Sequence, residues 1–217
     1  DNYLVIDGET TTTYTLVSVV DANDCSQAVN GSVTVEVFGL PAATISSSVT
    51  APVCEAGEVT LTFTLTQGIA PATITYNDGT ADQNVDVLTG ETTATVIVNP
   101  TANTTYSIVS VTDANTCVGT GTSTSAEVVT VEVLPQPIIT ISGDNTICSG
   151  ENSTLTITQT QGATPFTFVY NDGTTDITAS SSELPIIVTP NATTTYTLVS
   201  VTDANGCSNV DALTTTA

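Results

Sequence analysis

Hydrophobic and polar residues alternate with a period of two along most of this chain. Between positions 61 and 66 the residues Leu, Thr, Phe, Thr, Leu and Thr place apolar side chains on one face of a strand and threonines on the other. The same alternation recurs at 129–133 and at 166–170. No apolar stripe with the 3.6-residue period of a helix has useful length. The pattern therefore predicts an all-β protein.

One block of sequence occurs three times. It reads YTLVSVVDANDC at Tyr14–Cys25, YSIVSVTDANTC at Tyr106–Cys117 and YTLVSVTDANGC at Tyr196–Cys207. The copies are 92 and 90 residues apart, which is about the size of one small β domain. A fixed period of this kind indicates a tandem array. Such arrays are more often spacers or binding surfaces than enzymes.

Shorter repeated motifs indicate where each repeat begins and ends. The motif YNDGT at Tyr76–Thr80 recurs unchanged at Tyr170–Thr174, and VCEAGE at Val53–Glu58 recurs one residue shorter at Ile147–Glu151. The chain then resembles a window cut from a longer array. The segments expected are the C-terminal part (strands E–G) of one repeat at 1–39, a complete repeat at 41–134, and a repeat truncated in its last strand at 137–217.

The complete repeat has about seven short strands, with turn residues about every 8–12 positions, which is typical of an immunoglobulin-like β-sandwich. The core Trp and the mid-strand cysteine pair of antibody domains are missing, so the likeness is to the architecture alone. The expected strands are A at 42–46, B at 58–66, C at 72–77, a variable hairpin at 80–90, E at 92–98, F at 104–112 and G at 126–134.

The charge of the chain excludes several classes of partner. There are 22 acidic residues and no Lys, Arg or His, which gives a formal net charge of −22. Without cationic side chains the chain cannot neutralise phosphates, so nucleic-acid binding is excluded, and it has no electrostatic dock for anionic lipid. No apolar stretch approaches ~18 residues, so direct membrane insertion is not expected. The acidic coat repels itself and favours a soluble, extended array.

The five cysteines indicate disulfides in an oxidising, extracellular compartment, because there is no His and no CxxC pair to suggest zinc. Sequence order alone pairs Cys54 with Cys117 and Cys148 with Cys207, inside each repeat. Sandwich geometry argues against those pairs, since the A–B and F–G ends are a strand of ~6–8 residues apart at ~3.3 Å each, whereas a disulfide spans ~4.4–6.8 Å between α-carbons. We therefore favour a bond between repeats, Cys54 with Cys207. Cys25, Cys117 and Cys148 would then reach repeats outside the window, and the within-repeat pairs remain the alternative.

The chain offers little for catalysis. Paired carboxylates can run glycoside hydrolysis, but the acids recur with the repeat at turn positions and none is unique to one copy, so no enzyme is expected. Calcium is the one cofactor worth considering, since it takes ~6–8 oxygen ligands. Asp113 with Asn115 and Asp203 with Asn205 recur at the F–G turn and are the candidate ligands. The alternative is that tight turns simply prefer Asp and Asn.

Three motifs together are distinctive: VCEAGEVTLT at 53–62, YNDGT at 76–80 and TTTYTLVSVTDANGC at 193–207. They resemble the tandem Ig-like or PKD-like repeats of very large Bacteroidota surface proteins, among them the SprB-type gliding-motility adhesins. The likeness covers essentially the whole chain, in units. It implies an extracellular, cell-surface location and export by type IX secretion. The partners it implies are neighbouring repeats and the outer-membrane motility or secretion machinery.

The leading hypothesis is a repeat segment of a long adhesin filament with a mechanical role in gliding motility or surface attachment. One alternative is a set of spacer modules in a secreted hydrolase. Another is a calcium-rigidified adhesin whose exposed threonine rows bind glycans or ice. The full-length size separates the first two, and melting with and without EDTA tests the third.

Overall fold

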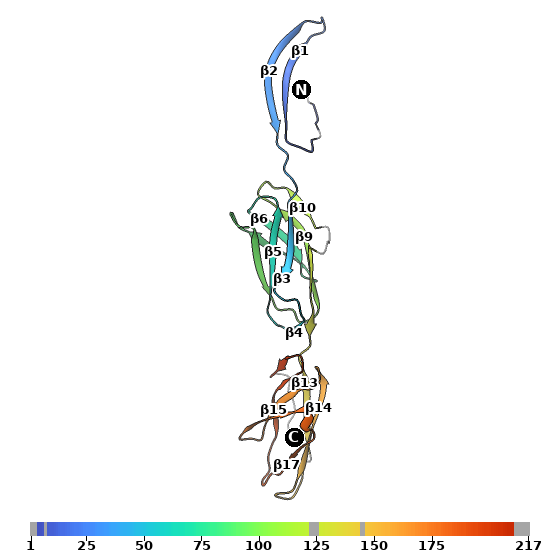
Figure 1. The fold of residues 1–217 in the computed structure, drawn as a ribbon, viewed down its shortest axis with the longest axis vertical. Helices are drawn as coiled ribbons and strands as arrows, with labels where there is room; N and C mark the ends of the chain where they lie inside the picture. Colours follow the sequence, from blue (N-terminus) through green and yellow to red (C-terminus); the bar gives the residue numbers. More distant parts are fainter. Residues whose placement is uncertain (1–3, 7, 122–125, 144–145, 211–217) are drawn as a thin grey trace. The chain divides into compact units, whose positions relative to one another are not determined.

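The computed structural model describes residues 4–6, 8–121, 126–143 and 146–210 (Figure 1). They form strands and one short 3-10 helix, η1 (Ser181–Glu183), with no α-helix among them. The all-β prediction is confirmed. No helix in the described ranges has the length and hydrophobicity that a membrane span requires.

The chain divides into two compact units. One comprises residues 1–46, 62–95 and 107–128, and the other comprises residues 47–61, 96–106 and 129–217. The division therefore crosses the repeat predicted at 41–134 instead of following its ends.

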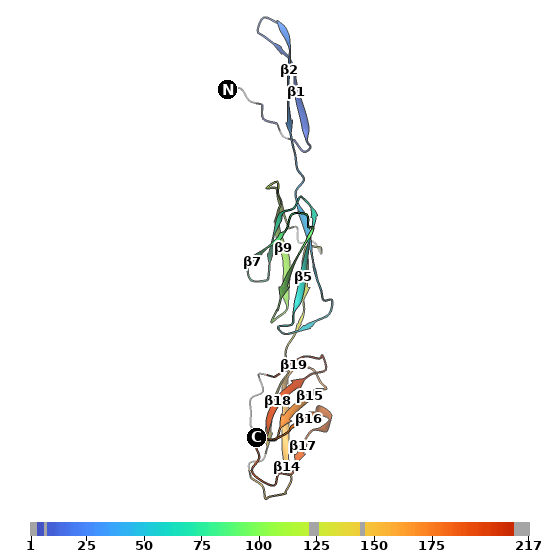
Figure 2. The same cartoon turned by 90° about the vertical axis from the view of Figure 1, so that its left-hand side faces the viewer.

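The first unit begins with a hairpin of two antiparallel strands, β1 (Thr12–Val20) and β2 (Ser26–Val35), which lie side by side in both views (Figures 1 and 2). Three strands, E–G, were expected within 1–39, and the described residues of that range contain two, β1 and β2. Leu4 and Val5 are 83% and 81% exposed and belong to no strand.

The first unit also contains most of a sheet with the order β10-β9-β6-β7, in which β11 also pairs with β9. In this unit Phe63, an apolar position of the period-two pattern, is fully buried as expected. Ile74 is also fully buried, and the Phe63 and Tyr76 ring centroids lie 4.7 Å apart. The strands are β6 (Ala72–Asn77), β7 (Asp82–Val87), β9 (Thr104–Thr112), β10 (Val118–Thr120) and β11 (Val128–Val131). A further sheet has the order β3-β5-β8, with β3 (Ala42–Ser47), β5 (Val59–Gln67) and β8 (Thr93–Val98).

Expected strands A, B, C, E and F agree with β3, β5, β6, β8 and β9 to within one or two residues. Strand G, expected at 126–134, is instead broken into β11 and β12 (Val133–Leu134), and β10 precedes it. The break is caused by contacts with residues distant in the sequence. Val133 donates its N–H to Oδ1 of Asn103 at 2.7 Å, and β12 then pairs in parallel with β4 (Val53–Cys54).

The second unit contains a sandwich of two sheets, seen in Figure 2. One has the order β13-β14-β17 and the other β16-β15-β18-β19, which repeat the orders β3-β5-β8 and β7-β6-β9-β10. Ile139, Leu155, Phe168 and Val201 are buried in its core. The strands are β13 (Ile138–Gly143), β14 (Ser153–Gln161), β15 (Thr167–Asn171), β16 (Asp176–Ser180), β17 (Ile186–Val188), β18 (Thr197–Thr202) and β19 (Ser208–Asn209). This is an Ig-like β-sandwich, as predicted. Its expected truncated last strand falls at 211–217, outside the described residues.

The repeated YNDGT motif forms a turn closed by its aspartate. Oδ1 of Asp78 accepts hydrogen bonds from the N–H of Thr80 at 2.9 Å, the hydroxyl of Thr80 at 2.6 Å and the N–H of Ala81 at 2.8 Å. Asp172 makes the same three bonds in the next repeat, with Thr174 and Thr175. The hydroxyl of Thr80 is the main cause that lowers the pKa of Asp78 to about 2, and the two backbone donors add to it.

We expect the carboxyl of Asp78 to titrate well below an ordinary aspartate. Its folded pKa lies below the unfolded value of 3.8, so its stabilising effect is fully present above about pH 4 and is lost as the pH falls toward 2. The carboxyl carbon shift of Asp78, followed by NMR against pH, measures this. Thr80→Val is the control variant, because removing the hydroxyl should raise the Asp78 pKa. A midpoint at or above 3.8 in the unmodified chain would contradict the assignment.

Candidate functional site: a disulfide carried by a repeated turn

The structure joins Cys54 to Cys207 by a disulfide, with the α-carbons 5.4 Å apart and a sequence separation of 153. This is the bond between repeats that sandwich geometry favoured, and both residues lie in the second unit. The alternative bonds, Cys54–Cys117 and Cys148–Cys207, are therefore not formed. Cys25, Cys117 and Cys148 carry free thiols.

On one side of the disulfide, hydrogen bonds to strand β12 hold the backbone around Cys54. In the parallel pair of β4 and β12, Val133 lies opposite Val53 and Leu134 opposite Cys54. Glu55 donates its N–H to the carbonyl of Leu134 at 2.8 Å. The chain then turns sharply, as Gly57 donates to the carbonyl of Cys54 at 2.8 Å. The position of Cys54 is thus fixed by backbone hydrogen bonds before and after it.

On the other side, Cys207 is fully buried and closes the Asp-Ala-Asn-Gly-Cys turn. Oδ1 of Asp203 accepts the N–H of Asn205 at 2.9 Å and that of Cys207 at 3.0 Å. Oδ2 accepts the N–H of Ala163 at 2.9 Å, from the loop between β14 and β15. Asp203 is only 6% exposed. One buried carboxylate therefore positions the bonded cysteine and ties its turn to a loop 40 residues earlier.

The other two copies show which of these bonds belong to the turn itself. Oδ1 of Asp113 accepts the N–H of Asn115 and of Cys117, and Oδ1 of Asp21 accepts the N–H of Asn23 and of Cys25. These inner bonds form in all three copies, including the exposed hairpin.

The bond to the preceding loop depends on a second motif. Oδ2 of Asp113 accepts the N–H of Ile69 at 3.3 Å, as Oδ2 of Asp203 does from Ala163. Both loops carry the motif Gln-Gly-x-x-Pro, and its glycines, Gly68 and Gly162, have φ of +104° and +103°. A Cβ on either glycine would press on Pro41 or Pro137. The motif is visible in the sequence, but its contact with the aspartate was missed.

The residue before the cysteine has a positive φ in every copy: 60° at Asp24, 64° at Thr116 and 82° at Gly206. Nothing lies within 4 Å of a Cβ placed on Gly206, so a substitution there tests the backbone conformation alone. We expect Gly206→Thr to destabilise the chain by about 1 kcal/mol, because a β-branched residue resists this region. Gly206→Asn is the matched control and should change little, since Asn tolerates it. Urea denaturation measures both, and equal losses would contradict the explanation.

The aspartates among the candidate calcium ligands act as hydrogen-bond acceptors for backbone N–H groups in this structure. Both carboxylate oxygens of Asp113 and of Asp203 accept backbone N–H groups. Nδ2 of Asn115 is buried without a hydrogen-bond partner, whereas Asn205 is exposed, so the two asparagines do not share an environment. Within the described ranges, no three His, Cys, Asp or Glu side chains gather in a way that could hold a metal. The arrangement supports the tight-turn interpretation of these residues.

We expect calcium to leave the melting temperature unchanged. An ion that takes ~6–8 oxygen ligands would have to displace the backbone donors of Asp113 or Asp203. Melting should be compared in CaCl₂, in EDTA, and in NaCl at matched ionic strength, because a chain of charge −22 responds to salt alone. A calcium-specific rise that Asp113→Ala or Asp203→Ala abolishes would restore calcium as a ligand.

Residues 134–217 match the family model of the PKD-like domain, which is less than half of the chain. A search of the curated proteins found no match. Among solved structures, the full ectodomain (Ig1–Ig3) of mouse nectin-like molecule 4 is similar, at 13% identity over 86% of this chain and 70% of that chain, with a TM-score of 0.35. A likeness of that degree does not bear on function. The part of the chain that carries Cys207 is thus similar to the PKD-like domain.

Proposed function

We propose that this chain is a repeat segment of a long extracellular adhesin filament, which transmits force in gliding motility or surface attachment. The observation that carries the proposal is the Cys54–Cys207 bond, which joins two successive repeats covalently. The PKD-like match of residues 134–217 fits a structural or adhesion-type module. The resemblance to repeats of Bacteroidota gliding adhesins supports the cell surface as the location and type IX secretion as the export route.

The bond changes how the chain carries tension. When the chain is pulled from positions before Cys54 and after Cys207, the covalent path runs through the two sulfur atoms. Residues 55–206, which include β5 to β18, then lie outside that path. The strand ladders of these residues do not bear the load directly. A force-transmitting repeat gains from this because it limits its own extension.

The surface of the chain suits a filament that contacts few partners. The chain has 22 Asp and Glu residues and no Lys, Arg or His, so its formal net charge is −22. We propose no catalytic role, since the buried aspartates cap turns and recur with the repeat. Neighbouring repeats and the outer-membrane motility or secretion machinery are the proposed partners, and nucleic acid is not one.

Imaging intact cells with an antibody to this segment tests the proposal. We expect label along surface fibres, and loss of gliding or attachment when the repeats are deleted from the full-length protein. A matched strain that lacks only a tip domain should keep the fibre label. Label confined to a released hydrolase would instead support the spacer alternative, and loss of glycan or ice binding without any change in attachment would support the third hypothesis.

A further inference from the structure

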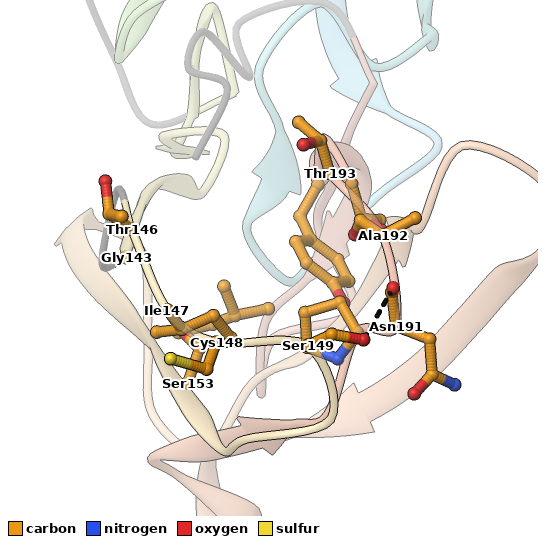
Figure 3. Close-up of a pocket in the computed structure, with 13 residues that line it drawn as sticks. Gly143, Thr146, Ile147, Cys148, Ser149, Ser153, Asn191, Ala192 and Thr193 are labelled. Carbon is orange, nitrogen blue, oxygen red and sulfur yellow. Dashed lines mark hydrogen bonds between the residues drawn. The ribbon is translucent and has the colours of Figure 1, made fainter.

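A cavity of about 470 Å³ opens beside Cys148 in the second unit. Ile147, Cys148 and Ser149 line one side of it, and Asn191, Ala192 and Thr193 line another, as Figure 3 shows. Ser149 donates its hydroxyl to the carbonyl of Asn191 at 2.9 Å, which ties the two sides together. Cys148 is exposed and its thiol is free.

The preceding repeat has a site that corresponds to this cavity, and there the site is occupied by other parts of the chain. Ile147 and Cys148 correspond to Val53 and Cys54, 94 positions earlier, and Thr193 corresponds to Asn103, 90 positions earlier. In the earlier repeat, Val53–Cys54 pairs with β12, and Asn103 accepts the N–H of Val133. There the cysteine is also bonded to the turn of another repeat.

The backbone around Cys148 already has the shape found around Cys54. Glu151 donates to the carbonyl of Cys148 at 3.0 Å, as Gly57 does to Cys54 at 2.8 Å. Gly150 donates to the carbonyl of Pro190 at 3.1 Å, where Ala56 donates to the carbonyl of Pro100 at 3.0 Å. No rebuilding of the loop is therefore needed to present the thiol in the same way.

We propose that Cys148 forms a second disulfide between repeats, with the cysteine of the Asp-Ala-Asn-x-Cys turn of a second copy of this chain. The cavity beside Cys148 would bind that turn. The turn at Asp21–Cys25 has the required form, since Asp21 holds the N–H of Cys25 at 3.0 Å, as Asp203 holds that of Cys207. Cys25 is exposed and free. The inference rests on the proposed function, because the disulfide from Cys148 to a second copy would extend the series of covalently joined repeats in the filament.

The bond forms by oxidation with a low-molecular-weight disulfide such as oxidised glutathione. The thiolate of Cys148 attacks that disulfide and releases one glutathione thiol. The thiolate of Cys25 from the second copy then attacks the mixed disulfide and releases the second. Two protons and two electrons leave the protein thiols, and the two glutathione molecules take them up. Each copy of the chain carries a formal net charge of −22, so added salt should speed the reaction by screening the repulsion between the two copies.

The full chain, incubated in a glutathione redox buffer, tests this. We expect covalent oligomers on a non-reducing gel, and a peptide that joins Cys148 to Cys25. Mapping needs a protease that cleaves at acidic residues, since the chain has no Lys or Arg. Cys148→Ser should abolish the oligomers and leave the Cys54–Cys207 bond intact, which also shows that the variant is folded. Cys117→Ser is the matched control and should still form Cys148–Cys25 bonds.

A second variant tests the cavity and leaves the thiol untouched. Thr193 is exposed on the wall opposite Cys148, so Thr193→Trp should fill the cavity and slow oligomer formation at least tenfold. Oligomers that form at the same rate in this variant would overturn the role of the cavity. A Cys148 that stays reduced, or that forms only Cys148–Cys148 dimers, would overturn the bridge itself. Neither result would alter the fibre labelling that tests the proposed function.

Discussion

Breaking the Cys54–Cys207 bond should add about 500 Å to the length that the chain releases when it is stretched from its ends. With the bond intact, the residues between the two cysteines lie outside the covalent path and cannot extend. Their sequence separation of 153 corresponds to this length at about 3.3–3.6 Å per residue in a fully extended chain. The effect depends on connectivity alone, so it does not require any particular strength of the strand ladders.

Single-molecule stretching with handles at both ends measures the released length. We expect a long contour gain for the Cys54→Ser variant, and for the unmodified chain in the presence of a reductant. Cys117→Ser is the matched control, because it also removes a cysteine but leaves the bond in place, and it should behave as the unmodified chain does. Equal released lengths with and without reductant would show that the bond does not carry tension.

Much of the fold follows from the sequence because the period-two alternation decides which side chains are buried. The alternation at 61–66 placed Leu61 and Phe63 on the core side, and both are fully buried. The disulfide could be predicted from the sequence for a related reason. Once the strands were arranged as a sandwich, the lengths of the strands placed Cys54 and Cys117 at opposite ends, and a bond to Cys207 of the next repeat became the shorter one.

Side-chain bonds to distant backbone account for what was missed. Oδ1 of Asn103 takes the N–H of Val133 and so breaks strand G, and nothing in a local pattern marks an asparagine 30 residues earlier as its partner. The hydrogen bond from the N–H of Ala163 to Asp203 was missed in the same way. The Asp-Ala-Asn-Gly-Cys and Gln-Gly-x-x-Pro motifs are both visible in the sequence, but the contact between them is not. Both interpretations of the aspartates, calcium ligand and turn cap, use the same residues. The donors around their oxygens distinguish them, and those depend on tertiary structure.

Asp203→Ala should be among the most destabilising single substitutions in the second unit. It removes the acceptor of three backbone N–H groups in a site that is 6% exposed, and a buried donor left unsatisfied costs ~1–3 kcal/mol. Water can reach the exposed Asn205, so its donor contributes little. We expect a total loss of about 2–4 kcal/mol in urea denaturation. Reduction of the Cys54–Cys207 bond should also become faster, because the N–H of Cys207 loses its anchor.

Asp21→Ala provides the control within the same chain. Asp21 accepts the same two turn bonds, from Asn23 and Cys25, but it is exposed. Its removal should therefore cost about 0.5–1 kcal/mol, as for an exposed cap. The difference between the two variants isolates burial and the bond to the loop at Ala163. If the two losses were equal, the loop contact would contribute nothing, and the turn would hold Cys207 in place by its local hydrogen bonds alone.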